Sequence, residues 1–428
     1  MRAAALLLLA SCAAPVPLPL REVEERDRAF RPPAAGRTDE IVRQESLGVE
    51  DALQLADALN PQLASERARI DLATAAIWEA RLHPNPAFVV SVEDWRPSGG
   101  GAKAVAGVEV PIVFGGRIGA AESAAAAERD AEALRYLWRR REILSEVKRA
   151  FVAVLTARRV ADLARETRDL AKALHDATEE RFKARAVPEM ELLKAAVNLA
   201  KAETDLRVAD KEIAVSVKAL QVAIGNADLP RDRFAGALAG RFAPPPLETL
   251  LKLDAHPLLA AAAKDRDAAE LRIALAKAER FPDIGLEVTG GVDPDGEAIV
   301  QGGLRVPLPL FNRNQAKIAE AEIRLRQADL RIRQARNDLI LRLTEAYRNL
   351  TAAQERVTAY TEEILPKARQ ALDQTNEGYA RGKFGYLDVL DAQRTLAEAK
   401  SVHAAALAEL NYAAVELEKL TGTNLERR

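Results

Sequence analysis

Two stretches of this chain join an apolar extended segment directly to a long alanine-rich helix pattern, and they lie about 197 residues apart. Residues 107–136 read GVEVPIVFGGRIGAAESAAAAERDAEALRY, and residues 303–332 read GLRVPLPLFNRNQAKIAEAEIRLRQADLRI. Three other matches keep the same order and nearly the same offset: Asn60-Pro61 with His256-Pro257, 80–93 with 278–290, and 181–195 with 378–392. An ordered set of matches at a nearly constant offset indicates a tandem duplication.

Each half of the duplication predicts the same series of elements. A helix (48–82, then 247–280) precedes two extended segments, a very long helix (117–182, then 313–378), a short break and a returning helix (188–224, then 385–421). In the long helices apolar residues recur three and four positions apart, which is typical of a coiled-coil seam. About 65 helical residues extend roughly 100 Å, more than a globular domain needs. We therefore predict a rod, with a kink at Pro366.

The extended segments are predicted as four β-strands, at about 86–95, 104–114, 283–292 and 298–309. Their residues alternate between an apolar face and a face that carries Glu93, Glu109, Glu287 and Arg305. Strands of about 9–11 residues are long enough to cross a bilayer when tilted, with lipid on one face and water on the other. Because four strands cannot close a barrel, several protomers would have to contribute to one. The alternative is a sheet packed on a soluble helical body, which the charged second face disfavours.

The N-terminal sequence MRAAALLLLASCAAP has a basic residue followed by a short apolar run, as in a signal peptide. The only cysteine of the chain, Cys12, ends a Leu-Ala-Ser-Cys motif that resembles the bacterial lipobox, where the cysteine is acylated. The expected organisation is a lipoprotein signal peptide with its lipidated cysteine (1–12), a flexible tether (13–46), a first repeat (47–230), a linker (231–246) and a second repeat (247–428).

The composition gives little support to an enzyme or to a nucleic-acid-binding protein. The chain has 62 basic and 64 acidic residues, so no strong field favours nucleic acid. Phosphate loops of the Walker type, nucleophile elbows and metal-ligand spacings are lacking, and the four histidines are scattered. We therefore expect no catalysis, no cofactor and no resident metal.

The chain resembles the TolC family of outer-membrane efflux channels over essentially its whole mature length. The motifs that carry the resemblance are HPNP (83–86), VPLPLFNRNQ (306–315) and GYARGKFGYLDVLDAQRTL (378–396). The second motif is most like the CzcC-type group, which serves heavy-metal resistance-nodulation-division (RND) pumps. The resemblance implies a mainly α fold with a small β part. Each protomer would supply long helices to a coiled-coil periplasmic tunnel and four membrane strands to a 12-stranded β-barrel completed in a homotrimer.

The resemblance also implies partners and a location. A periplasmic adaptor (membrane fusion protein) would dock on the helix-hairpin tips, and an inner-membrane RND pump would supply the substrate. The protein would lie in the bacterial outer membrane, with a large periplasmic part and a lipid anchor. The expected function is a passive exit channel, with heavy-metal cations as the expected substrate. Drug efflux and type I protein secretion are alternatives, as is a purely structural coiled-coil lipoprotein, which would not need the strands.

Two groups of candidate site residues lie at the breaks between the long helices. Asp388 and Asp391 share a helix face, match the family positions that ring the closed periplasmic aperture, and could alternatively only stabilise the helix start. The breaks are expected farthest from the barrel, and their predicted docking residues are Ala184, Ala186, Val187, Gly382, Phe384 and Gly385. Phe384 stands where family members often carry a basic residue of the entrance lock.

Overall fold

The computed structural model describes residues 37–93, 102–230, 234–293 and 295–425. Cys12, the predicted signal peptide and most of the predicted tether lie outside these residues. The tether was expected to continue to residue 46, but α2 (Arg37–Arg43) is helical. Its Ile41 is fully buried in a hydrophobic core, and burial of an apolar side chain favours an ordered segment over a flexible one.

The described chain divides into two compact units. Glu66–Tyr136 and Asp254–Arg336 belong to the first, which contains the strands and is called the sheet unit here. The second is called the hairpin unit; it comprises Leu137–Leu253 and the described residues among 21–65 and 337–428. Two long helices, α5 (Arg117–Lys183) and α9 (Gln315–Ala359), contribute residues to both units. Helices and one small sheet therefore make up the described chain, which confirms the predicted fold class.

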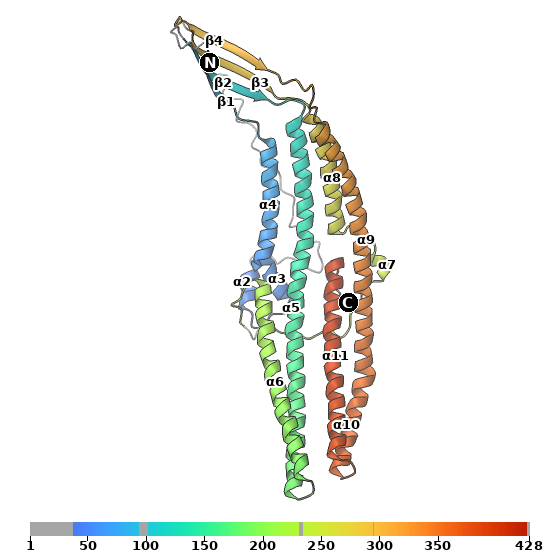
Figure 1. Ribbon diagram of the computed structural model, residues 1–428. Coiled ribbons are helices and arrows are strands. Elements are labelled where there is room, and N and C mark those ends of the chain that lie inside the picture. Colours follow the sequence, from blue (N-terminus) through green and yellow to red (C-terminus); the bar gives the residue numbers. More distant parts are fainter. Residues whose placement is uncertain (1–36, 94–101, 231–233, 294, 426–428) are drawn as a thin grey trace. The chain divides into compact units, whose positions relative to one another are not determined.

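The sheet unit carries one antiparallel sheet with the order β1-β2-β3-β4 (Figure 1). Its strands are β1 (Ala87–Glu93), β2 (Lys103–Ile112), β3 (Ile284–Val292) and β4 (Ala298–Arg305). The central pairing of β2 with β3 joins the two repeats, with Val108 opposite Val288. The strand expected at 298–309 ends four residues earlier, because Pro307 and Pro309 have no N–H to donate to a neighbouring strand.

The two faces of the sheet differ in chemistry. One face exposes a continuous set of large apolar side chains: Phe88, Val90, Val92, Val108, Val110, Ile112, Leu286 and Val288. The other face carries charges that pair across strands, Lys103 with Glu93 at 2.9 Å and Arg305 with Glu109 at 3.2 Å. An exposed apolar patch of this extent marks a surface that meets lipid or another protein.

Four helices of the sheet unit lie side by side in the order α4 (Pro61–Arg81), α5, α8 (Pro257–Ala278) and α9 (Figure 1). Ion pairs join each neighbouring pair of helices. The single helix expected at 247–280 is divided into α7 (Leu247–Leu250) and α8. Here α8 starts at a proline, and the ring of His256 accepts a hydrogen bond from the Leu258 N–H at 3.2 Å. A side-chain cap followed by proline is a strong helix start, which explains the division.

The first-half helix expected at 48–82 is divided in the same way. In the structure α3 (Val49–Leu59) ends at Asn60, whose side-chain oxygen accepts from the N–H groups of Gln62 and Leu63. The residue before a proline disfavours the α conformation, so the Asn60-Pro61 dipeptide ends one helix and caps the next. Near Pro366, where a kink was expected, the structure has a π-helical turn over Tyr360–Ile364 that ends two residues before the proline.

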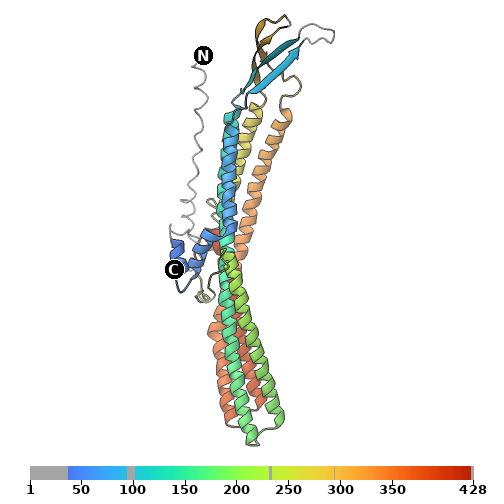
Figure 2. The same cartoon turned by 90° about the vertical axis from the view of Figure 1, so that its left-hand side faces the viewer.

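Two antiparallel helix pairs form most of the hairpin unit (Figures 1 and 2). One pair is α5 with α6 (Glu189–Ile224), and the other is α10 (Leu365–Ala380) with α11 (Tyr386–Thr421). A core around Phe151 and Phe234, whose rings meet edge to face at 6.2 Å, packs α5 and α6 against α3. No helix among the described residues is long and apolar enough for a membrane span.

A buried ion pair connects the two hairpins. Lys148 on α5 donates to Glu418 on α11 at 2.8 Å, and the two side chains are 6% and 1% exposed. The second carboxylate oxygen of Glu418 accepts from the Leu425 N–H, also at 2.8 Å. This carboxylate therefore holds both a helix of the first repeat and the segment that follows the last helix.

Candidate functional site

The turns at the ends of the two hairpins have the same backbone geometry. In the first turn the Ala186 N–H donates to the Arg181 carbonyl at 2.8 Å, and Arg185 has φ +59°. In the second turn the Lys383 N–H donates to the Gly378 carbonyl at 2.8 Å, and Gly382 has φ +72°. A six-to-one bond closed by a left-handed residue is the Schellman end of a helix. The two repeats therefore share the same hydrogen-bond pattern at their tips.

The predicted docking residues lie at these two tips. Val187 is half-buried, whereas Ala184, Ala186, Gly382, Phe384 and Gly385 are exposed. The Phe384 ring lies so close to Gly378 that a β-carbon there would meet it at 2.0 Å, so the ring packs on the backbone of its own hairpin. Exposed small residues leave the main chain of both tips accessible to another helix.

The two predicted aperture acids occupy the first turns of α11 and are both exposed. Asp388 accepts a hydrogen bond from the Gly385 N–H at 2.8 Å, which makes it part of the helix start. Asp391 lies three residues further along, on the same helical face. Asp388 therefore makes a capping contact at the helix start, and one of its oxygens is engaged by the backbone.

A cluster of side chains just behind the tips joins the two hairpins. Leu174, Ala195, Tyr379, Tyr386 and Val389 form one buried group, and the Arg181 guanidinium stacks over the Tyr379 ring at 4.4 Å. Burial raises the pKa of the Tyr386 phenol above its usual value. Sequence reasoning missed this cluster. A tyrosine on each side of the turn in GYARGKFGY is the signal that could have indicated it.

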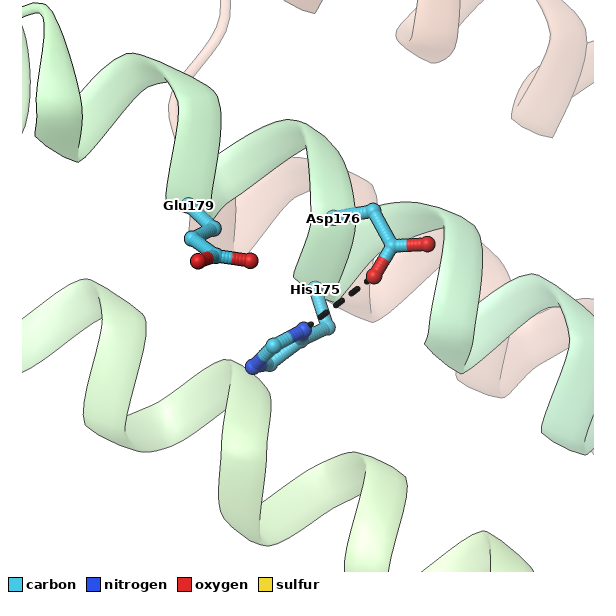
Figure 3. Close-up of side chains that lie close together, drawn as sticks. All are labelled: His175, Asp176 and Glu179. Carbon is cyan, nitrogen blue, oxygen red and sulfur yellow. Dashed lines mark hydrogen bonds and ion pairs between the residues drawn. The ribbon is translucent and has the colours of Figure 1, made fainter.

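Three side chains with metal-ligand atoms also lie together on α5 near the first tip. His175, Asp176 and Glu179 bring one ligand atom each within 4.8 Å of one another (Figure 3). Both carboxylates already have cationic partners, because Lys172 contacts Asp176 at 3.2 Å and Lys183 contacts Glu179 at 3.1 Å. The hydrogen bond from Lys172, with that of His175, lowers the pKa of Asp176. A metal ion would have to displace these lysines. The four-residue spacing of His175 and Glu179 could have indicated the group.

Comparison with known proteins identifies the family. The family model described as "Outer membrane efflux protein" matches the chain twice, over residues 52–226 and 251–423. These two matches together cover well over half of the sequence. The chain belongs to the outer membrane efflux protein family, which confirms the resemblance inferred from its motifs.

A characterised relative lies in the predicted subgroup. The cobalt-zinc-cadmium resistance protein CzcC of Cupriavidus metallidurans is 32% identical over 380 residues, which span 88% of this chain and 90% of that protein. Among solved structures, CusC has a TM-score of 0.73 at 19% identity, covering 88% of this chain and 92% of its own. The outer membrane protein VceC of Vibrio cholerae has a TM-score of 0.70 at 17% identity, covering 91% and 97%. These matches cover 88–91% of the chain, and the two solved structures show that it shares their fold.

Proposed function

We propose that this protein is the outer-membrane exit channel of a tripartite efflux system that carries heavy-metal cations. The observation that supports it most is the similarity to a cobalt-zinc-cadmium resistance protein across nearly the full length of both chains. The channel conducts passively. An inner-membrane RND pump supplies the energy, and a periplasmic adaptor joins the pump to the hairpin tips.

The sheet supports a homotrimer as the working form. β1 and β4 are the two edges of the sheet, and an exposed edge offers unpaired N–H and C=O groups to another chain. Three copies joined edge to edge would give a closed sheet of twelve strands. Its apolar face would meet the acyl chains of the outer membrane, and its charged face would line water. The same closure would arrange the long helices as a tunnel in the periplasm.

The aperture acids provide the test of this function. Three copies would place Asp388 and Asp391 in one ring of six carboxylates. Carboxylates about 6 Å apart repel by about 3 kcal/mol at an effective dielectric of 20. The ring would therefore favour cations, and protons or multivalent cations would relieve its repulsion. We expect purified protein to conduct in planar lipid bilayers with cation selectivity and with block by trivalent cations. The double variant Asp388→Ala/Asp391→Ala should lose both properties.

Glu189→Ala is the matched control, because this acid is exposed at the start of α6 but was not assigned to the aperture. The mass of the detergent-solubilised protein should correspond to three chains. A monomeric protein that fails to conduct would contradict the proposed channel. Normal conduction with unchanged selectivity and block in the double variant would leave Asp388 and Asp391 with only their helix-start role.

Lipidation of Cys12 is the proposed means of anchoring the N-terminus in the membrane. Replacing Cys12 with serine should abolish metabolic labelling of the chain by palmitate, because the oxygen of serine does not accept the lipobox modification. Ser11→Ala leaves the cysteine in place and should keep the label. Persistent labelling of Cys12→Ser would show that this residue is not the acylated one.

A further inference from the structure

A charged groove lies on one side of the helical layer in the sheet unit. It has a volume of about 600 Å³ and is lined by residues from α4, α5, α8 and α9. Its five arginines are Arg69, Arg135, Arg272, Arg324 and Arg331, and its three carboxylates are Glu128, Glu132 and Asp265. We propose that this groove binds small multivalent anions, of the phosphate or polycarboxylate class.

The groove shows that the four-helix layer is curved. The helices lie in the order α4, α5, α8, α9, so α4 and α9 are its outer members (Figure 1). Neighbouring helices pack about 8–10 Å apart, which would separate the outer two by roughly 25–30 Å in a flat layer. Arg69 on α4 and Arg331 on α9 nevertheless line one groove. The side that holds the groove is therefore concave. If three such layers close as proposed above, the concave sides face the tunnel.

The carboxylates in the groove are already paired with its two central arginines. Arg135 on α5 contacts both Glu132 on its own helix and Asp265 on α8. Arg272 on α8 contacts Glu128 on α5 at 2.6 Å. Burial acts to lower the pKa of Arg135, but its contacts with Asp265 and Glu132 raise that pKa overall. The acids therefore connect α5 to α8, and they are engaged by the two central arginines.

The arginines of the outer helices are the ones left to meet a ligand. Arg69 contacts Glu66 at 3.2 Å and Arg324 contacts Glu320 at 2.5 Å, and both acids belong to the same helix as their arginine and lie outside the groove. Both arginine side chains are more than half exposed. Exposed pairs of this kind contribute only about 0.3–0.5 kcal/mol, so an anion can readily replace the acid.

The shape and chemistry of the groove select the class of ligand. Alanines such as Ala73, Ala262 and Ala269 line the groove, so space remains between the long arginine side chains. Arg324 and Arg331 are seven residues apart, about 10 Å along one face of α9. A guanidinium donates two parallel hydrogen bonds to a phosphate or carboxylate group. An anion with several such groups can engage two or three of these arginines together, whereas a monovalent anion engages one.

Pyrophosphate binding to the full chain in detergent tests this site. Pyrophosphate at low ionic strength should raise the melting temperature of the protein in a saturable way. The double variant Arg324→Gln/Arg331→Gln should weaken pyrophosphate affinity by roughly tenfold or more, because it removes charge-assisted hydrogen bonds. Arg326→Gln/Arg333→Gln is the matched control: the same change at the same spacing on α9, at positions that do not line the groove.

A second measurement separates this site from the proposed channel. In planar bilayers pyrophosphate should lower the conductance of the wild type and of the Arg326/Arg333 control, but not of the Arg324/Arg331 variant. If the protein binds pyrophosphate at these arginines but never conducts, the result would refute the proposed channel and support the anion site. A conducting protein that binds pyrophosphate equally in both double variants, or does not bind it, would overturn the anion site.

Discussion

Replacing Glu418 with alanine is expected to destabilise the hairpin unit by about 3–5 kcal/mol. The carboxylate of Glu418 is almost completely buried, where it accepts from Lys148 and from the Leu425 N–H. The substitution would leave a buried ammonium group and a buried peptide N–H without this acceptor. A buried charge is costly when its opposite charge is removed. The loss of stability should therefore exceed the loss caused by removing an ordinary hydrogen bond. Urea unfolding followed by circular dichroism in detergent measures the change.

Two further variants make this prediction specific. Glu416→Ala removes an acid two residues earlier on α11 that is 35% exposed and pairs with Lys419 at 2.6 Å, and it should cost less than about 1 kcal/mol. Lys148→Met combined with Glu418→Leu replaces both charges by apolar side chains, and should recover much of the loss. Equal urea unfolding midpoints for Glu418→Ala and Glu416→Ala would show that the buried pair contributes no more to stability than a surface pair.

The order of the elements could be predicted from the sequence because each depends on local periodicity. Alternation with period two indicated the strands, and apolar spacing of three and four indicated the long helices. The divisions at Asn60-Pro61 and His256-Pro257 were missed although proline gave the signal, because the apolar pattern continues across both dipeptides. The early start of structure at α2 was missed because Ile41 and Val42 are the only apolar residues of this charged helix, and the burial of Ile41 depends on a core from distant residues.

Of the candidate functional residues, only those at a break in a helix pattern could be predicted from the sequence. The tips at Arg185 and Gly382 were found in this way. The tyrosine cluster and the Lys148–Glu418 pair were not found, because their members come from helices far apart in the sequence. The anion groove depends on the curvature of a four-helix layer. No periodicity within one helix indicates that Arg69 and Arg331 share a concave surface.

If the protein is the exit channel proposed above, Gly382→Trp is expected to reduce metal resistance to the level of a strain without the protein. Gly382 lies at the exposed second tip with φ +72°, and a β-carbon there would meet no atom within 4 Å. An indole at this position would project from the surface where the adaptor is proposed to dock, and would hold a partner helix away from the backbone. Resistance at graded metal concentrations is the measurement, in cells that also express the pump and adaptor.

The control variant must separate the effect of side-chain bulk at position 382 from the effect of backbone strain in the turn. The corresponding residue of the first tip, Arg185, has φ +59°, so the left-handed conformation is compatible with a side chain in this turn. Asparagine adopts that conformation more readily than most residues, so Gly382→Asn introduces a small side chain with little strain and should keep nearly full resistance. Trimer yield and bilayer conductance of Gly382→Trp should equal those of the wild type, because the tip lies outside the sheet unit. Equal loss of resistance in both variants would indicate strain in the turn, and full resistance in Gly382→Trp would show that the adaptor docks elsewhere.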